Sequence, residues 1–326
     1  MTDTILSIRD LTVEIPTRHG ILRPVNGVSY DIAEGEVLGV VGESGAGKSM
    51  AGNAVIGLLS PPAHIAQGEI WVRGTRVDHL KGEDMRRLRG KEIGMVFQDP
   101  LTSLNPLLRI GDQLTETMLA HLDISRREAE NRAVAALEEV GIPGARERVG
   151  SYPHEFSGGM RQRVVIALAL CAEPSLIIAD EPTTALDVSV QAQIIALLKK
   201  LCRERGTAVM LITHDMGVIA EAADRVAVMY AGQLAELGAV RDVLTTPYHP
   251  YTDGLMGSTP LASRGKDRLH QIPGAMPQLD ALPEGCAFHP RCPRAQDRCR
   301  SAPGPRIEDG TGRAACWFPM EREAVA

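Results

Sequence analysis

The sequence predicts an α/β fold, with helices covering a mainly parallel sheet, followed by a small cysteine-rich domain. Segments 36–41 and 176–181 are almost continuously apolar, as strands of a buried parallel sheet are. A helical pattern at 188–206 separates two such strands, 176–181 and 208–215, which is the order that builds a parallel sheet. Residues 245–326 hold eleven of the 21 prolines and four of the six cysteines. This composition predicts a small domain that its cysteines hold together.

The elements follow one another in a regular order. Apolar patterns bounded by turns predict early strands at 5–16 and 24–32 and further strands at 69–74 and 93–98. Between them, the strand 36–41 leads through a glycine-rich loop into a helix that we expect Pro61 and Pro62 to stop. Residues 99–172 are mostly helical in pattern. They include an amphipathic segment that ends at Gly141.

Composition limits the classes of function. A chain of 326 residues with 44% hydrophobic residues can bury a full core. The formal net charge of −6 argues against nucleic acid as the main partner, because phosphate binding favours a basic face. The N-terminus lacks the pattern of a signal peptide, and the longest apolar run, 164–172, is far shorter than the ~20 residues of a spanning helix. We therefore expect a cytoplasmic chain with reduced thiols.

The loop "GESGAGKS" at residues 42–49 fits the pattern G-x-x-x-x-G-K-[ST] without a mismatch. Its glycines allow backbone amides to wrap a phosphate chain at the start of a helix. A chance match in a chain of this length has odds on the order of 1%. Lys48 is expected to reach the β- and γ-phosphates, and Ser49 to bind Mg²⁺. The other predicted ATP-binding residues of the loop are Gly42, Ser44, Gly45 and Gly47.

The strand 175–181 ends in two adjacent acids, Asp180 and Glu181. Two carboxylates at the end of a buried strand are costly without a cation. We expect Asp180 to bind Mg²⁺ and Glu181 to polarise the attacking water. The alternative is a solvated strand end, which the presence of a phosphate loop in the same chain disfavours.

The segment "EFSGGMRQR" at residues 155–163 resembles the signature motif of ATP-binding cassette (ABC) proteins, with Phe156 for the usual Leu and Met160 for the usual Gln. Other motifs follow in the order of that family. Gln98 in "VFQDPLTSLNP" matches the Q-loop, Asp187 at the end of "TTALD" the D-loop, and His214 the switch histidine.

The resemblance implies a parallel-sheet core with an antiparallel β subdomain and a helical subdomain at about 99–172, together forming a nucleotide-binding domain at 1–244. Residues 245–326 would be the appended domain. It also implies that two cassettes enclose two ATP molecules, so that the signature residues act on ATP held by a partner. The catalytic residues would be Glu181, His214 and Gln98; the magnesium ligands Ser49, Gln98 and Asp180; and the residues acting in trans Ser157, Gly158 and Gly159.

Longer strings, including "FQDPLTSLNP" and "IADEPTTALDVSVQAQI", resemble ATP-binding subunits of oligopeptide and dipeptide importers of the peptide/nickel family. The resemblance implies ATP hydrolysis that powers peptide uptake at the cytoplasmic face of the membrane. It also implies two membrane permease subunits, a paralogous second ATPase subunit and an external solute-binding protein. The segment "DPLTSLNP" would couple ATP to the permease. One departure is Ile15, which occupies the position where the family usually has an aromatic residue for adenine.

Two alternatives stay open for the function. One is an importer of nickel chelates or another small solute. The more remote one is an ABC ATPase linked to DNA or ribosomes. The single phosphate loop, the separation of only about 100 residues between Ser49 and Ser157, and the net acidity disfavour it.

The tail carries cysteines in the spacing C-x5-C-x6-C-x16-C. Four thiolates are the usual ligand set of a [4Fe–4S] cluster, and the resemblance to peptide importers supports the same centre. Zinc is the alternative, with His289 as a substitute ligand, although zinc sites usually pair ligands two to four residues apart. Disulfides rank third, because we expect a reducing compartment. The interpretation that involves no centre at all is four buried free thiols, which is what we expect of Cys171 and Cys202. The four predicted ligands are Cys286, Cys292, Cys299 and Cys316.

Overall fold

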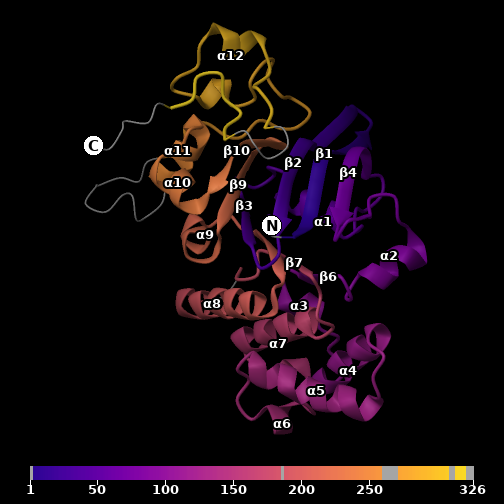
Figure 1. Ribbon diagram of the computed structural model, residues 1–326. Helices are drawn as coiled ribbons and strands as arrows, with labels where there is room; N and C mark the ends of the chain where they lie inside the picture. Colours follow the sequence, from indigo (N-terminus) through magenta and orange to yellow (C-terminus); the bar gives the residue numbers. More distant parts are fainter. Residues whose placement is uncertain (1–2, 185–186, 259–270, 308–312, 321–326) are drawn as a thin grey trace. The chain divides into compact units, whose positions relative to one another are not determined.

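The computed structural model describes residues 3–184, 187–258, 271–307 and 313–320 (Figure 1). The chain divides into two compact units. The P-loop unit, named for the phosphate loop at 42–49, consists of Leu6–Ile32, Val37–His79 and Ile212–Ala326. The helical unit consists of Met1–Ile5, Ala33–Glu36 and Leu80–Leu211.

The P-loop unit contains an antiparallel sheet with the strand order β2-β1-β4-β5. Strand β1 pairs with β4 in a register that runs from Leu6 opposite Val72 to Glu14 opposite His64. The inward side chains of β1, including Leu6, Ile8 and Val13, are fully buried. This sheet confirms the predicted strands at 5–16, 24–32 and 69–74. The strand bounds are Thr4–Thr17 for β1, Gly20–Ala33 for β2, His64–Val72 for β4 and Thr75–Arg76 for β5.

A second group of strands in this unit has the order β10-β9-β3. Strand β3 (Val37–Val41) is buried along its whole length and pairs in parallel with β9 (Arg225–Tyr230). Strand β10 (Gln233–Ala239) is antiparallel to β9. The continuous apolar pattern of β3 predicted this environment, whereas β9 and β10 were not among the strands predicted from the sequence.

Helix α1 (Lys48–Val55) begins at the end of the phosphate loop. It ends well before Pro61, so the prediction that the two prolines stop it was wrong. Gly57 adopts φ 65°, and its N–H donates to the carbonyl of Ala54 at 3.2 Å. A glycine in the left-handed conformation is a common helix terminator, because it satisfies the last carbonyls at no steric cost.

The C-terminal part of the P-loop unit consists of short helices and loops. An aromatic cluster joins them to the sheet: Phe288 contacts the rings of Tyr230 and Tyr251, with centroids 5.2 and 5.4 Å away. Phe288 and Tyr251 are almost fully buried. The helices are α9 (Met216–Ala222), α10 (Val240–Thr245), α11 (Pro250–Gly257), η2 (His289–Arg291) and α12 (Asp297–Ser301).

The helical unit combines the strand order β8-β7-β6 with a group of helices. Strands β6 (Ile93–Val96) and β7 (Leu176–Asp180) pair in parallel, and β8 (Ala208–Ile212) is the neighbour of β7. All three confirm predicted strands. The long helix α8 (Val188–Arg205) separates β7 from β8 in the chain, as the sequence pattern predicted, and Gly206 caps it with φ 68°.

Helices α4, α5, α6 and α7 lie together in Figure 1. The amphipathic segment that was predicted to end at Gly141 forms α5, and the hydroxyl of Ser125 accepts the N–H of Glu128 at its start. No helix in the described part of the chain is long and apolar enough to span a bilayer. The helix bounds in this unit are α2 Gly82–Leu88, α3 Pro100–Ser103, α4 Ile110–His121, α5 Arg126–Glu139, α6 Ala145–Arg148, η1 Pro153–Glu155 and α7 Gly158–Leu170.

Candidate functional site

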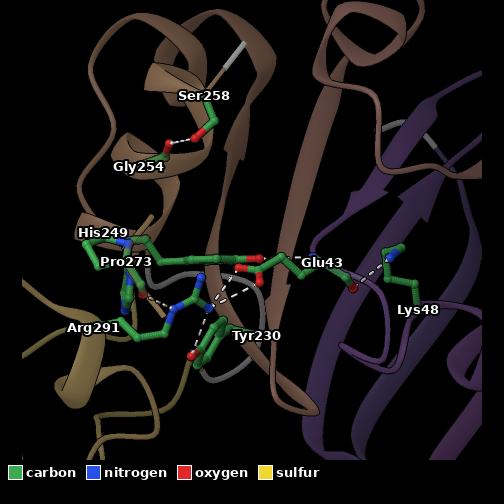
Figure 2. A network of polar contacts seen from close by, with 9 residues as sticks. Glu43, Lys48, Tyr230, His249, Gly254, Ser258, Pro273 and Arg291 are labelled. Atoms are coloured by element: carbon green, nitrogen blue, oxygen red, sulfur yellow. Dashed lines mark hydrogen bonds and ion pairs between the residues drawn. The ribbon is translucent and has the colours of Figure 1, made fainter. Parts of the chain in front are cut away.

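The lysine of the phosphate loop donates hydrogen bonds to backbone carbonyls of the same loop. Lys48 is buried, and its Nζ donates to the carbonyl of Gly42 at 2.8 Å. It also donates to the carbonyl of Glu43 at 3.0 Å (Figure 2). Ser44, Gly45 and Ser49 are exposed on the loop. The backbone amides at the start of α1 carry the partial positive charge that suits an anion.

Two glycines of this loop are required by backbone geometry. Gly42 has φ 152° and Gly47 has φ 103°, both of which L side chains rarely adopt. A Cβ atom on Gly42 would collide with the carbonyl oxygen of Met229, and one on Gly47 with that of Pro24. Both positions need glycine because the loop packs directly on neighbouring backbone.

The acidic end of β7 is held in an unusual conformation. Glu181 follows Asp180, the last residue of β7, and has φ 47° although it is not glycine. Its Oε2 accepts the side-chain amide of Gln98 at 3.0 Å and the hydroxyl of Thr184 at 2.9 Å. Non-glycine residues at positive φ are uncommon and concentrate at functional sites. The structure thus brings together Glu181 and Gln98, while the contribution of Thr184 was not predicted.

The predicted switch histidine lies in the P-loop unit, two residues after the end of β8. His214 is exposed, and the next residue, Asp215, caps α9 by accepting the N–H groups of Gly217 and Val218. Glu181 belongs to the helical unit. The sequence patterns placed both residues at the ends of strands, and the structure confirms these local positions.

The signature segment forms the N-terminus of α7. Ser157 is the N-cap residue, and its hydroxyl accepts the N–H of Met160 at 3.4 Å. Ser157 and Gly158 are exposed, whereas Phe156, which replaces the usual leucine, is buried. An exposed, glycine-rich helix start can offer its free amides to an anion.

The structure also gives the positions of the other residues that the motifs singled out. Asp187 precedes α8, and its carbonyl accepts the N–H of Gln191 at 2.8 Å. Residues 185–186 of the same D-loop motif lie outside the described residues. Ile15, at the position where the family usually has an aromatic residue for adenine, is half-buried in β1. Tyr30 of β2 is fully buried, and burial raises the pKa of its hydroxyl.

Four cysteines of the tail come together. Cys286, Cys292, Cys299 and Cys316 line one small cleft with about 360 Å³ of space, open solvent included. Burial, and then the neighbouring thiols, raise the pKa of Cys286 and Cys316, the latter to about 11. All six cysteines carry free thiols. Among the described residues, no group of three or more His, Cys, Asp or Glu side chains has the arrangement to hold a metal ion.

The other two cysteines differ in their surroundings. Cys171 and Cys202 are buried in the helical unit, and burial raises the pKa of each thiol to about 12. Their interpretation as plain buried thiols is confirmed. The four tail thiols instead share one cleft.

Many folds carry one phosphate loop. This chain has two further features. It exposes a second glycine-rich helix start at Ser157, and the side chain of Gln98 donates a hydrogen bond to Glu181 at the end of β7. Together with the phosphate loop, these features are typical of an ATP-binding cassette. Comparison with known proteins supports this class. Residues 25–184 match the family described as ABC transporter, and residues 235–299 match the oligopeptide/dipeptide transporter C-terminal region.

Two named proteins are similar in sequence to this chain over nearly its whole length. The dipeptide transport ATP-binding protein DppD of Bacillus subtilis is 46% identical over 98% of this chain and 96% of its own length. The oligopeptide transport ATP-binding protein OppD of Escherichia coli is 48% identical over 98% of this chain and 94% of its own length. The chain belongs to the ABC transporter family, in the group of oligopeptide and dipeptide transport ATP-binding proteins.

Solved structures support the fold. The dimeric ATP-binding cassette MJ0796, in a post-hydrolysis state bound to ADP and Pi, matches with a TM-score of 0.65 and 29% identity, covering 73% of this chain and 99% of that one. The cassette cbiO1 of Clostridium perfringens matches with a TM-score of 0.65 over 75% of this chain and 92% of that one. The predicted ABC fold is therefore confirmed.

Proposed function

We propose that this chain hydrolyses ATP to power the uptake of dipeptides or oligopeptides through membrane permease subunits, at the cytoplasmic face of the membrane. The names of its relatives support the substrate class. The observation that carries the catalytic assignment is the contact between Gln98 and Glu181, which holds a carboxylate in a strained conformation at the end of β7. A fixed carboxylate can orient and polarise a water molecule.

The proposed roles follow from the local geometry. Lys48 and Ser49 would hold the β- and γ-phosphates and Mg²⁺, with Gln98 and Asp180 as further magnesium ligands. Mg²⁺, when bound, neutralises charge on the phosphates. Glu181 would accept a proton from the attacking water, and His214 would stabilise the charge that develops on the γ-phosphate. Gly42, Ser44, Gly45 and Gly47 would supply the loop that surrounds the phosphates.

The exposed start of α7 supports a role in trans. Ser157, Gly158 and Gly159 would bind ATP held by a second cassette, because their own chain already has a phosphate loop at 42–49. We expect this partner to be a paralogous ATPase subunit of the same transporter, with an external solute-binding protein delivering the peptide. The dimeric state of the related cassette MJ0796 supports the paired arrangement.

The segment after Gln98 is proposed to contact the permease. Leu107, directly after this segment, is 82% exposed, and Leu108 is exposed as well. The loop is nevertheless ordered: the buried side chain of Gln113 accepts the N–H of Asn105 at 2.9 Å and donates to the carbonyls of Asn105 and Leu108 at 3.1 Å. Exposed apolar side chains on a fixed loop suit a protein partner.

We further propose a nucleotide-binding domain at 1–244 and an appended domain at 245–326, in which Cys286, Cys292, Cys299 and Cys316 hold a [4Fe–4S] cluster. The shared cleft supports this, because four thiolates are the ligand set that such a cluster takes. A thiolate-bound cluster would link the segments 286–299 and 313–320, which consist of short helices and loops. Zinc remains the alternative centre.

A reconstituted transporter tests the function. The chain, its paralogous subunit and the permease subunits would be placed in vesicles with the solute-binding protein, and ATP hydrolysis would be measured. We expect peptides to stimulate hydrolysis, whereas stimulation by nickel chelates alone, or by DNA without permease, would replace the proposal with one of its alternatives.

A further inference from the structure

The segment that carries the tail cysteines reaches the phosphate loop through one arginine. Arg291, in η2 directly before Cys292, has a side chain that is only 6% exposed. Its Nη1 lies 3.0 and 3.2 Å from the two carboxylate oxygens of Glu43, and its Nε donates to the carbonyl of Pro273 at 2.9 Å (Figure 2). Glu43 is the second residue of the phosphate loop.

The same glutamate is held at its backbone. The hydroxyl of Tyr251 in α11 is 3.0 Å from the N atom of Glu43 and accepts its N–H. The carbonyl of Glu43 in turn accepts the Nζ of Lys48 at 3.0 Å. Three groups therefore fix this residue, one at the side chain and two at the backbone, and a continuous set of contacts runs from Arg291 through Glu43 to the phosphate-binding lysine.

The charge of Glu43 makes its partner important. A carboxylate beside a loop that binds a polyphosphate repels its ligand unless a cation neutralises it. The carboxylate is mostly shielded, with 29% of its side chain exposed, so solvent screens it only in part. Arg291 supplies a cation with the planar donor geometry that suits a carboxylate, and the ring of Tyr230 lies 5.8 Å from its guanidinium carbon.

We propose that Arg291 is a positioning residue of the ATP site: it neutralises Glu43 and holds it so that the phosphate loop keeps its shape and its affinity for MgATP. This inference rests on the proposed ATP site at Lys48 and Ser49. It assigns to the cysteine-rich region a part in nucleotide binding that acts through Glu43. This part is independent of which metal the cysteines hold.

The test measures MgATP binding by titration calorimetry on the full-length subunit. We expect Arg291→Met to weaken binding by about five- to fifty-fold, because it leaves a shielded carboxylate without its cation. Arg291→Lys, which keeps the charge, should bind within about threefold of the parent. Arg300→Met serves as the matched control, because Arg300 is an exposed arginine of the same cysteine-rich region.

A double variant separates charge from structure. If Arg291 acts on Glu43, then Glu43→Gln combined with Arg291→Met should restore binding to within about threefold of Glu43→Gln alone. The loss of MgATP affinity in Arg291→Met should also be smaller in about 1 M salt. At that salt concentration the Debye length is about 3 Å, so the repulsion between Glu43 and the phosphates is screened. A structural role would produce neither the rescue nor the salt dependence.

The outcomes distinguish this inference from the proposed site. Normal binding by Arg291→Met, or a loss that Glu43→Gln does not rescue, overturns the inference. Should Arg291→Met fail to fold, Arg291→Gln, which also lacks the charge, takes its place in the same comparisons. Normal MgATP binding by Lys48→Ala overturns the proposed ATP site itself, whatever the Arg291 variants do.

Discussion

The side-chain amide of Gln98 donates to Oε2 of Glu181 at 3.0 Å, across 83 positions of the sequence. Gln98 follows β6 and Glu181 follows β7, and these two strands are parallel neighbours. Their carboxyl ends therefore meet at one edge of the sheet, which is where ligands bind in parallel α/β folds. The contact restrains the side chain of the proposed catalytic carboxylate.

Replacing this carboxylate should separate binding from hydrolysis. Glu181→Gln retains the shape of the side chain but removes its charge, so we expect ATP hydrolysis in the assembled transporter to fall about 10²–10⁴-fold. Nucleotide binding should persist. Gln98→Ala, which removes only the amide partner, should reduce hydrolysis less. Parental hydrolysis by Glu181→Gln would show that another group activates the water.

The two glycine-rich helix starts should act on different ATP molecules. Lys48→Ala is expected to abolish ATP binding by the isolated subunit, because it removes the charge that meets the phosphates. Ser157→Arg should leave that binding intact and block hydrolysis in the complex, since Ser157 faces outward at the start of α7. Equilibrium binding on the isolated subunit and ATP hydrolysis by the complex measure the two effects. Equal loss of binding by the isolated subunit in both variants would contradict the role in trans.

The proposed permease contact can be mapped by cross-linking. Cysteines introduced at Ser103 or Asn105, beside the exposed Leu107, should cross-link to cytoplasmic loops of the permease in the assembled complex. A cysteine at the exposed Glu138 of α5 is the control position and should give little product. Mass spectrometry would identify the linked peptides. Products from Glu138 alone would place the contact on another surface.

The metal proposal predicts a coloured protein. Anaerobic purification should give a brown subunit that absorbs at about 400 nm and contains roughly four irons. Cys316→Ser should lower the iron content, whereas Cys202→Ala, in the helical unit, should not. One zinc per chain in a colourless preparation would establish the alternative centre. A metal-free protein with four reactive tail thiols would remove the centre.

Buried His249 should make the P-loop unit sensitive to acid. Burial lowers its pKa from 6.5 to about 4, while its Nδ1 accepts the N–H of Tyr251. Between these two values the unfolded chain binds more protons than the folded one, so stability should fall as the pH drops from about 6.5 to about 4, by up to about 3 kcal/mol.

His249→Asn is the informative variant, because asparagine can keep the helix cap. Its unfolding midpoint should depend less on pH across this window than that of the parent. Glu236, whose carboxylate accepts the N–H of residue 249 and whose pKa burial raises, contributes in the opposite direction in both proteins. The difference between the two profiles therefore isolates the histidine, and parallel profiles would show that His249 is not responsible.

Most of the strands and helices, and the local chemistry of each motif, could be predicted from the sequence. A continuous apolar pattern predicted β3 and β7 because their residues are buried on both faces. The glycine spacing of the loop at 42–49 predicted a phosphate site because backbone geometry at Gly42 and Gly47 excludes any side chain. These features depend on neighbours in the chain, and so they are visible in a short segment.

Tertiary structure decided what depends on distant residues. The strands β9 and β10 were not predicted, and the end of α1 was set by the conformation of Gly57 rather than by Pro61. The positive φ of Glu181 and its contact with Thr184 arise only when β7 is in place. The pairing of Arg291 with Glu43 joins positions separated by 248 residues. No local pattern encodes such a contact, because the charge of each residue is satisfied only when the folded chain brings the two together.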